Sequence, residues 1–331
     1  MSGVKCTSKR GFIYLCIMIL FALSSCTGEG GYSWPYLEYA AAQRIHTESG
    51  NVVYPAFAKE LCVTATDVPS EGLVFAEDEA CGLFDLNRNE VLYAHRIHAR
   101  MDPASMTKVL TAIIALENGS PDQVLTCYNS AYITDRDAQI LDMEEGERMT
   151  LHQALHFLLM FSANDVACMI AENISGSEEA FVDLMNEKLT EIGATNSHFM
   201  NPHGLTDAEQ YVTPYDMYLI FQYALRFETF TEIIGKTTYK TEYYKADGEL
   251  KEVEIGSTNA FLREGTGVSA PAGVTVIGGK TGTTLAAGNC LILLARDVNG
   301  DPYIAVFMHA KDRGSLYENL TELLKKTVRK N

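Results

Sequence analysis

The sequence PASMTKVLTAIIALENG, residues 103–119, reads as one helix. A proline near the start and a glycine after the end are helix start and stop signals. Ser105 and Lys108 are three residues apart, and this spacing places two side chains on one face of a helix. A hydroxyl beside an amine can act as nucleophile and base, provided that burial or a second cation lowers the pKa of the lysine.

Two further short motifs follow in the chain. The first is SAN, residues 162–164, at the break between two stretches of helical character. The second is KTGT, residues 280–283, which comes after two glycines on a predicted strand. Each motif alone is weak, as is S-x-x-K, which occurs by chance in many helices. Three motifs in this order, on a helix start, a helix break and a strand, are a specific signal.

The residue types suggest how these motifs divide the work. Ser105 is suited to attack a carbonyl group, and Lys108 to take its proton. Lys280 supplies a second positive charge, which would help keep Lys108 neutral and could also bind a substrate carboxylate. Ser162 can pass a proton to a leaving nitrogen. Asn164 can hold a substrate amide or orient Lys108.

Backbone groups complete the expected site. The N–H of Ser105 and one N–H on the Lys280 strand, that of Thr283, can form an oxyanion hole. We expect Lys280, Thr281, Gly282 and Thr283 to line the substrate-binding side of the site.

The three motifs resemble the signature of penicillin-binding proteins and class A β-lactamases. The second motif is S-x-N, as penicillin-binding proteins commonly show. Three longer stretches, residues 85–93, 192–205 and 278–291, are similar to serine-type D-alanyl-D-alanine carboxypeptidases, which are low-molecular-mass penicillin-binding proteins. This resemblance covers roughly residues 75–331.

The resemblance implies a fold and an activity. It implies removal of the terminal D-alanine from peptidoglycan stem peptides through an acyl-Ser105 intermediate, with no cofactor and no metal. It also implies that β-lactams, which mimic the D-alanyl-D-alanine end, acylate Ser105. The implied fold is the α+β fold of β-lactamases and transpeptidases.

The pattern of elements leads to the same fold class. Apolar runs at 80–86 and 91–94 around a polar turn predict a β-hairpin, and runs at 274–277, 290–295 and 303–308 predict further strands. Several helices are predicted between them, and a last helix over residues 315–328 carries leucines at helical spacing. We therefore expect an antiparallel sheet flanked by helices, with an inserted helical sub-domain. The segment from Phe57 to Thr66 is compatible with a helix or a strand.

The N-terminal residues have the composition of an export signal. Basic residues precede an apolar run from Phe12 to Leu23, which is too short to span a bilayer comfortably. The run ends in LSSC, which resembles the lipobox of bacterial lipoproteins and implies lipidation of Cys26. We expect a signal peptide at 1–25, a tether and poorly defined segment at 26–50, and the peptidase domain at 51–331, without a separate C-terminal β domain. The alternative is an ordinary cleaved signal.

Composition limits the partners. The net charge of −17 argues against nucleic acid as a partner. Five scattered cysteines follow the leader without any C-x-x-C pattern, which fits neither a disulfide framework nor a zinc site. The resemblances to a lipobox and to the carboxypeptidases, rather than composition, imply a location at the outer face of a bacterial membrane, facing the cell wall.

One departure from the family pattern concerns the substrate carboxylate. Many members carry an arginine on the strand before K-T-G, whereas this chain has Thr258 and Asn259 at the comparable place. Arg263 lies in a longer loop, and Arg313 is a candidate substitute.

Other functions fit the sequence less well or stay open. A class A β-lactamase needs a glutamate in an E-x-x-L-N context, which this sequence lacks after the second motif. A P-loop needs a glycine at the position that Val274 occupies, so that reading is excluded as well. His152 and His156 are spaced to bind a metal but have no evident third ligand. An endopeptidase that cuts D-alanyl cross-links would use the same site, and a non-catalytic penicillin-binding sensor is a further alternative.

Overall fold

The structure is a computed structural model. It describes residues 60–328 apart from 129, 130, 132, 134, 136 and 137, together with two short strands, β1 (Ile45–His46) and β2 (Val52–Val53). β1 and β2 pair antiparallel within a unit of residues 1–59, which is separate from the unit of residues 60–331. The expected signal peptide and Cys26 lie outside the described residues.

The larger unit is built on a five-stranded antiparallel sheet in the order β4-β3-β11-β10-β9. Its strands are β3 (Ala80–Asp85), β4 (Glu90–His95), β9 (Val274–Thr284), β10 (Gly288–Asp297) and β11 (Pro302–Ala310). The predicted hairpin and the three predicted C-terminal strands are therefore confirmed. The two ends of this unit meet in one sheet because β3 pairs with β11.

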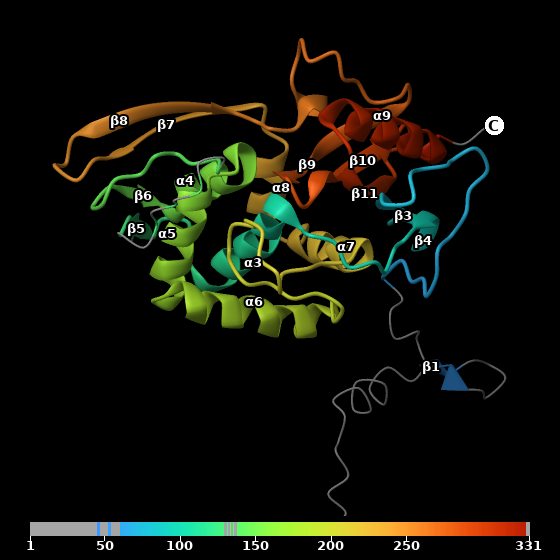
Figure 1. Ribbon diagram of the computed structural model, residues 1–331, viewed down its shortest axis with the longest axis horizontal. Coiled ribbons are helices and arrows are strands. Elements are labelled where there is room, and N and C mark those ends of the chain that lie inside the picture. The colour runs from blue at the N-terminus through green and yellow to red at the C-terminus, as the bar shows by residue number, and fades with distance from the viewer. Residues whose placement is uncertain are drawn as a thin grey trace, which may run out of the picture. The chain divides into compact units, whose positions relative to one another are not determined.

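Both faces of this sheet are covered. In β10, Leu291, Leu293 and Ala295 pack in one core with helix α9 (Arg313–Leu324), while Ile292 and Leu294 belong to a second core on the opposite face. Successive side chains of a strand point to opposite faces, which explains this alternation. The sheet consequently lies between α9 on one face and α7 on the other (Figure 1).

The face of the five-stranded sheet opposite α9 carries the inserted helices that the sequence predicted. They are α3 (Lys108–Asn118), α4 (Leu151–His156), α5 (Asn164–Ser175), α6 (Glu178–Ile192), α7 (Pro214–Ala224) and α8 (Glu228–Ile234). Thr150 caps α4, and its side chain and that of Gln153 form a capping box. The α+β class with a helical sub-domain is confirmed.

A second, four-stranded sheet was not expected. It has the order β5-β6-β7-β8, from β5 (Val124–Thr126), β6 (Arg148–Thr150), β7 (Thr238–Tyr244) and β8 (Leu250–Gly256). β7 and β8 form a hairpin in which most residues are exposed or half-buried and many are charged. Inner and exposed positions do alternate in both strands, but Thr241 and Lys251 occupy inner positions, so the apolar signal by which a strand is recognised in a sequence is weak.

The expectation of a helix or strand over Phe57–Thr66 is wrong for the described part, residues 60–66, which forms turns and irregular chain. Hydrogen bonds to distant side chains hold this segment instead. The Cys62 N–H donates to the hydroxyl of Tyr218, and the hydroxyl of Tyr215 donates to the Cys62 carbonyl. Both tyrosines belong to α7, so tertiary contacts replace local secondary structure here. None of the described helices has the length and apolarity needed to span a bilayer.

Candidate active site

Ser105 lies on a short 3₁₀ turn, η1 (Ala104–Thr107), that leads directly into α3. The sequence predicted one continuous helix from Pro103, so the first turn is tighter than expected. The consequence for the pair is small, because Lys108 follows as the first residue of α3 and its Nζ reaches the Ser105 Oγ at 3.0 Å. The predicted side-by-side arrangement of Ser105 and Lys108 is present.

The amine of Lys108 is fully buried and has three polar neighbours. Besides the Ser105 hydroxyl, Nζ donates to Asn164 Oδ1 at 2.5 Å and to the His203 carbonyl at 2.5 Å. A neutral amine has two hydrogens and one lone pair. Two neighbours are carbonyl oxygens that can only accept, so a neutral Lys108 would use both hydrogens on them and turn its lone pair to the Ser105 hydroxyl.

Electrostatics favour this neutral form. Burial lowers the pKa of Lys108 well below the usual 10.5, and the charge of Lys280 lowers it further. Asn164 and His203 supply carbonyl oxygens that carry no full negative charge. They therefore orient the amine but do not compensate the positive charge of an ammonium group. The geometry and the electrostatics together suit Lys108 to accept a proton from Ser105.

Lys280 is also fully buried, and its pKa is lowered to about 7 by burial. Its Nζ donates to the Ser162 Oγ at 2.9 Å, which joins the second and third motifs. Lys280 is paired with Ile292 in the sheet, so its side chain points to the face that carries the inserted helices. Ser162 lies on that face.

The backbone of Ser162 takes an unusual path. A π-helical turn, η3 (Phe157–Phe161), ends at Ser162, which has a left-handed φ of 71°, and α5 begins two residues later at Asn164. This break brings the two side chains toward different lysines, since Ser162 contacts Lys280 and Asn164 contacts Lys108. Non-glycine residues rarely adopt such a φ, and strained positions of this kind cluster at functional sites.

Asp165 holds the segment around residues 139–143 beside this break, a role that the sequence analysis did not assign. Its buried carboxylate accepts hydrogen bonds from the backbone N–H groups of Leu141 and Met143. The neighbouring Asn164 N–H donates to the Gln139 carbonyl at 2.8 Å. The segment around residue 140 is thereby fixed beside Ser162. The only signal in the sequence is the position of Asp165 directly after the SAN motif.

Strand β9 packs closely against the turn that carries Ser105. A Cβ atom added to Gly282 would lie 3.0 Å from the Ala104 Cβ and 3.1 Å from the Ser105 nitrogen, so this position favours glycine. Thr281 points to the other face, and its hydroxyl lies 2.6 Å from that of Thr258. Along β9, Lys280 and Gly282 thus face the inserted helices and the turn of Ser105, whereas Thr281 between them faces Thr258.

The loop that carries His203 is equally tight. Gly204 has a φ of +88°, and an added Cβ would lie 1.9 Å from the Ala104 carbonyl oxygen. Asn201 closes the loop, because its Oδ1 accepts from the Gly204 N–H and its Nδ2 donates to the Leu205 carbonyl. This packing places the His203 carbonyl on Lys108. Sequence reasoning could not find that contact, because a backbone carbonyl has no residue signature.

A cavity of about 310 Å³ opens over these groups. Of the predicted residues, Ser105, Ser162, Asn164, Thr281, Gly282 and Thr283 line it, while Lys108 and Lys280 lie buried in its wall. The guanidinium of Arg313 also lines it and donates to the Thr258 carbonyl at 3.3 Å. The three motifs, far apart in the chain, therefore meet at one opening.

Metal ligands are scarce in the part of the chain that the structure describes. There, the single group of three potential ligands is Cys168, Glu178 and His203. The pair of His152 and His156 belongs to no such group, and burial lowers the pKa of His156 to about 4. All the cysteines in the described part of the chain are free and buried; they are Cys62, Cys81, Cys127, Cys168 and Cys290.

Comparisons with known proteins agree with this geometry. Residues 75–312 match the family model described as D-alanyl-D-alanine carboxypeptidase. The chain is 33% identical over 234 residues to the D-alanyl-D-alanine carboxypeptidase DacF of Bacillus subtilis, covering 70% of this chain and 57% of the relative. It is 30% identical over 164 residues to DacA of Escherichia coli K12, covering 47% and 41%. The chain thus spans only about two fifths to three fifths of these relatives.

Solved structures show the same fold. The Streptomyces K15 DD-transpeptidase superimposes with a TM-score of 0.68 at 22% identity, over 74% of this chain and 95% of that one. A penicillin-binding protein homologue from Mycobacterium tuberculosis gives a TM-score of 0.66 at 24% identity, over 80% and 94%.

The close approach of Gly204 to the turn that carries Ser105 generates a testable expectation. Gly204→Ala should reduce the free energy of unfolding by about 1 to 3 kcal/mol more than Gly193→Ala does, because an overpacked contact adds to the strain of a positive φ. Gly193 is the matched control, since its φ is +86° but nothing lies within 4 Å of an added Cβ. Urea unfolding of both variants measures the difference, and equal losses would contradict the close approach.

Proposed function

The chain belongs to the D-alanyl-D-alanine carboxypeptidase family, and on that basis we propose that it removes the terminal D-alanine from peptidoglycan stem peptides. The observation that carries the proposal is the Lys108 amine, fully buried and 3.0 Å from the Ser105 hydroxyl. A buried neutral lysine on a serine has the properties of a general base on a nucleophile. The relatives named above are carboxypeptidases of this specificity by name.

In the proposed acylation step, Ser105 Oγ attacks the carbonyl carbon of the penultimate D-alanine. Lys108 takes the hydroxyl proton, and the peptide bond to the last D-alanine breaks. The proton that Lys108 took passes to the leaving nitrogen through the hydroxyl of Ser162, which is hydrogen-bonded to Lys280, so Lys108 is neutral again. Free D-alanine and an acyl-Ser105 ester result. In the second step water attacks the ester and Lys108 takes a proton from it. The bond to Ser105 Oγ breaks, Lys108 returns the proton to Oγ, and the shortened peptide leaves.

Strand β9 is suited to hold the peptide. It is the last strand in the order of its sheet, and its residues Thr281 and Thr283 line the cavity beside Ser105. An extended peptide can add to a sheet edge by backbone hydrogen bonds. We propose that the N–H groups of Ser105 and Thr283 bind the oxyanion that forms on the attacked carbonyl.

We assign the substrate carboxylate to the Lys280 side of the cavity, with Arg313 as its outer partner. Arg313 lies at the start of α9 and reaches the backbone of Thr258, whose hydroxyl contacts Thr281. Its guanidinium is therefore at the same end of the cavity as Thr281, although it comes from a different element than a strand-borne arginine. An arginine can bind a carboxylate through two parallel hydrogen bonds.

The proposal extends to inhibition and location. β-Lactams carry a carbonyl and a carboxylate in the arrangement of a D-alanyl-D-alanine end, so we propose that they acylate Ser105. The basic and apolar leader and the LSSC sequence support export and lipid attachment at Cys26. The enzyme would then act at the outer face of the bacterial membrane on the cell wall.

The activity is tested with diacetyl-Lys-D-Ala-D-Ala and an assay for free D-alanine. We expect the full chain to release D-alanine and Ser105→Ala to release none above background, because the acyl-enzyme cannot form. Fluorescent penicillin labelling runs in parallel on both proteins. Release without dependence on Ser105 would contradict the mechanism. Labelling of Ser105 without release would contradict the carboxypeptidase and favour an endopeptidase or a sensor, which cross-linked wall fragments would distinguish.

The role of Arg313 is tested by charge removal. Arg313→Gln should lower kcat/KM about 10- to 100-fold for the free tripeptide, since a charge-assisted hydrogen bond contributes about 1.5 to 3 kcal/mol. It should have little effect on the same peptide with an amidated C-terminus. Lys311→Gln is the matched control, because Lys311 is an exposed cation two residues away that does not line the cavity. Equal losses on both substrates would exclude carboxylate binding by Arg313.

A further inference from the structure

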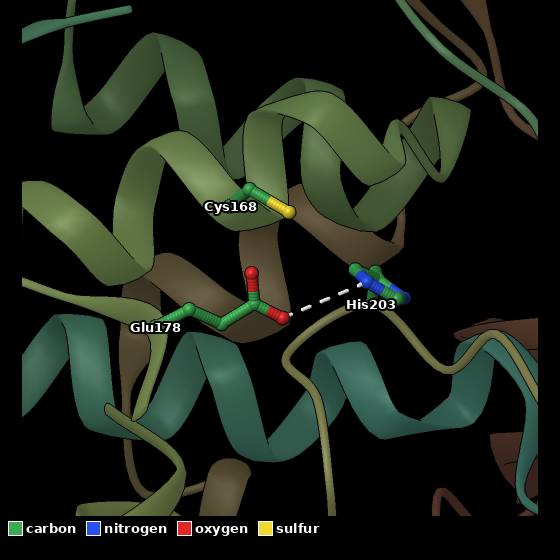
Figure 2. Close-up of side chains that lie close together, drawn as sticks. All are labelled: Cys168, Glu178 and His203. Carbon is green, nitrogen blue, oxygen red and sulfur yellow. Dashed lines mark ion pairs between the residues drawn. The ribbon is translucent and has the colours of Figure 1, made fainter. Parts of the chain in front are cut away.

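Three potential metal ligands converge behind the catalytic lysine. Cys168 lies on α5, Glu178 is the first residue of α6, and His203 belongs to the loop whose carbonyl accepts from Lys108. One ligand atom from each residue lies within 4.8 Å of the other two, and His203 Nε2 is 3.8 Å from Glu178 Oε1. Figure 2 shows the thiol, the carboxylate and the imidazole directed toward one shared space.

None of the three side chains has a part in the proposed hydrolysis. The catalytic mechanism uses the backbone carbonyl of His203, while its ring accepts a hydrogen bond from the Leu205 N–H at Nδ1 and directs Nε2 toward Glu178. Cys168 is 3% exposed and His203 8% exposed, whereas the side chain of Glu178 is 39% exposed. The cluster is therefore a nearly closed site that opens to solvent beside its carboxylate.

The donor set suits a thiophilic divalent cation. Thiolate, imidazole and carboxylate are the ligands of zinc, at about 2.0 to 2.3 Å from the metal. In a tetrahedral site ligand atoms lie roughly 3.3 to 3.8 Å apart, so atoms within 4.8 Å need only small side-chain rotations. The His203 Nδ1 accepts a hydrogen bond from the Leu205 N–H, so the neutral ring carries its proton on Nε2, which faces Glu178. Metal binding at Nε2 moves this proton to Nδ1 and breaks the bond to Leu205.

We propose that Cys168, Glu178 and His203 form a binding site for a thiophilic divalent cation such as Zn²⁺. The three side chains supply three ligands, and water from the opening beside Glu178 supplies the fourth. Binding is an exchange in which the metal displaces the thiol proton of Cys168, forms the metal–thiolate bond and releases one proton to solvent. No oxidant or reductant takes part.

The site has a consequence for catalysis. Exchange of one proton for a dication adds one positive charge to the cluster, next to the loop that positions Lys108. In acylation Lys108 itself becomes positive when it accepts the Ser105 proton. The added charge opposes that proton transfer, so we expect the bound metal to inhibit the enzyme. This consequence rests on the proposed function, whereas metal binding does not.

Cobalt is the probe for the site, because it reports a thiolate ligand by absorbance. Titration of the full chain with Co²⁺ should produce a near-ultraviolet thiolate-to-cobalt band that Zn²⁺ abolishes by displacement. Cys168→Ser should lose the band and weaken Zn²⁺ binding at least about tenfold. Cys127→Ala is the matched control, since Cys127 is another buried free cysteine outside the cluster, and it should keep both properties.

The opposing results are equally clear. The proposal would be overturned if the wild-type chain gave no band. It would also be overturned if Cys168→Ser left the band and the Zn²⁺ affinity unchanged, since the metal would then bind elsewhere. Saturating Zn²⁺ should slow D-alanine release several-fold in wild type and Cys127→Ala, but not in Cys168→Ser. A band that depends on Cys168, in a chain that releases no D-alanine, would sustain the site and reject the proposed carboxypeptidase.

Discussion

The hydrogen bond between the Lys108 amine and the Ser105 hydroxyl is the interaction on which the rest of this structure depends. A fully buried ammonium is costly to keep charged, and a lysine in this position gives up its proton instead. Asn164 and His203 offer two carbonyl oxygens, which fix the amine without neutralising a cation. Lys280 in its protonated form adds a second positive charge that favours the same outcome.

The two layers of the fold meet at this bond. The five-stranded sheet contributes Lys280 and Gly282 on one face of β9, and the inserted helices contribute Lys108 and Asn164. Glycines at 204 and 282 allow two separate segments to approach the turn of Ser105 more closely than any larger residue would. The site thus exists only when both layers are in place, and its precision comes from backbone packing as much as from the side chains that react.

The sequence was sufficient to predict the site residues that have chemically reactive or polar side chains. Ser105, Lys108, Ser162, Asn164 and Lys280 were predicted because three short motifs stand in one order on suitable elements, and the structure brings all five together. The contact of the His203 carbonyl and the anchoring of the segment around residue 140 by Asp165 were missed, because neither has a residue pattern of its own. The charged hairpin β7–β8 was missed because polar residues such as Thr241 and Lys251 occupy inner positions of its alternating pattern. Tyrosines more than 150 positions away determine the conformation around Cys62.

The most direct test of this account is the pKa of Lys108 itself, measured by NMR titration of the chain with ¹⁵N-labelled lysine. The Lys108→Met variant assigns the signal. Because burial and Lys280 both disfavour the charged amine, the account predicts titration well below the usual 10.5, so that Lys108 is largely neutral where an ordinary lysine is charged. A Lys108 signal that titrates near 10.5 would contradict it, since a charged ammonium cannot accept the proton of Ser105.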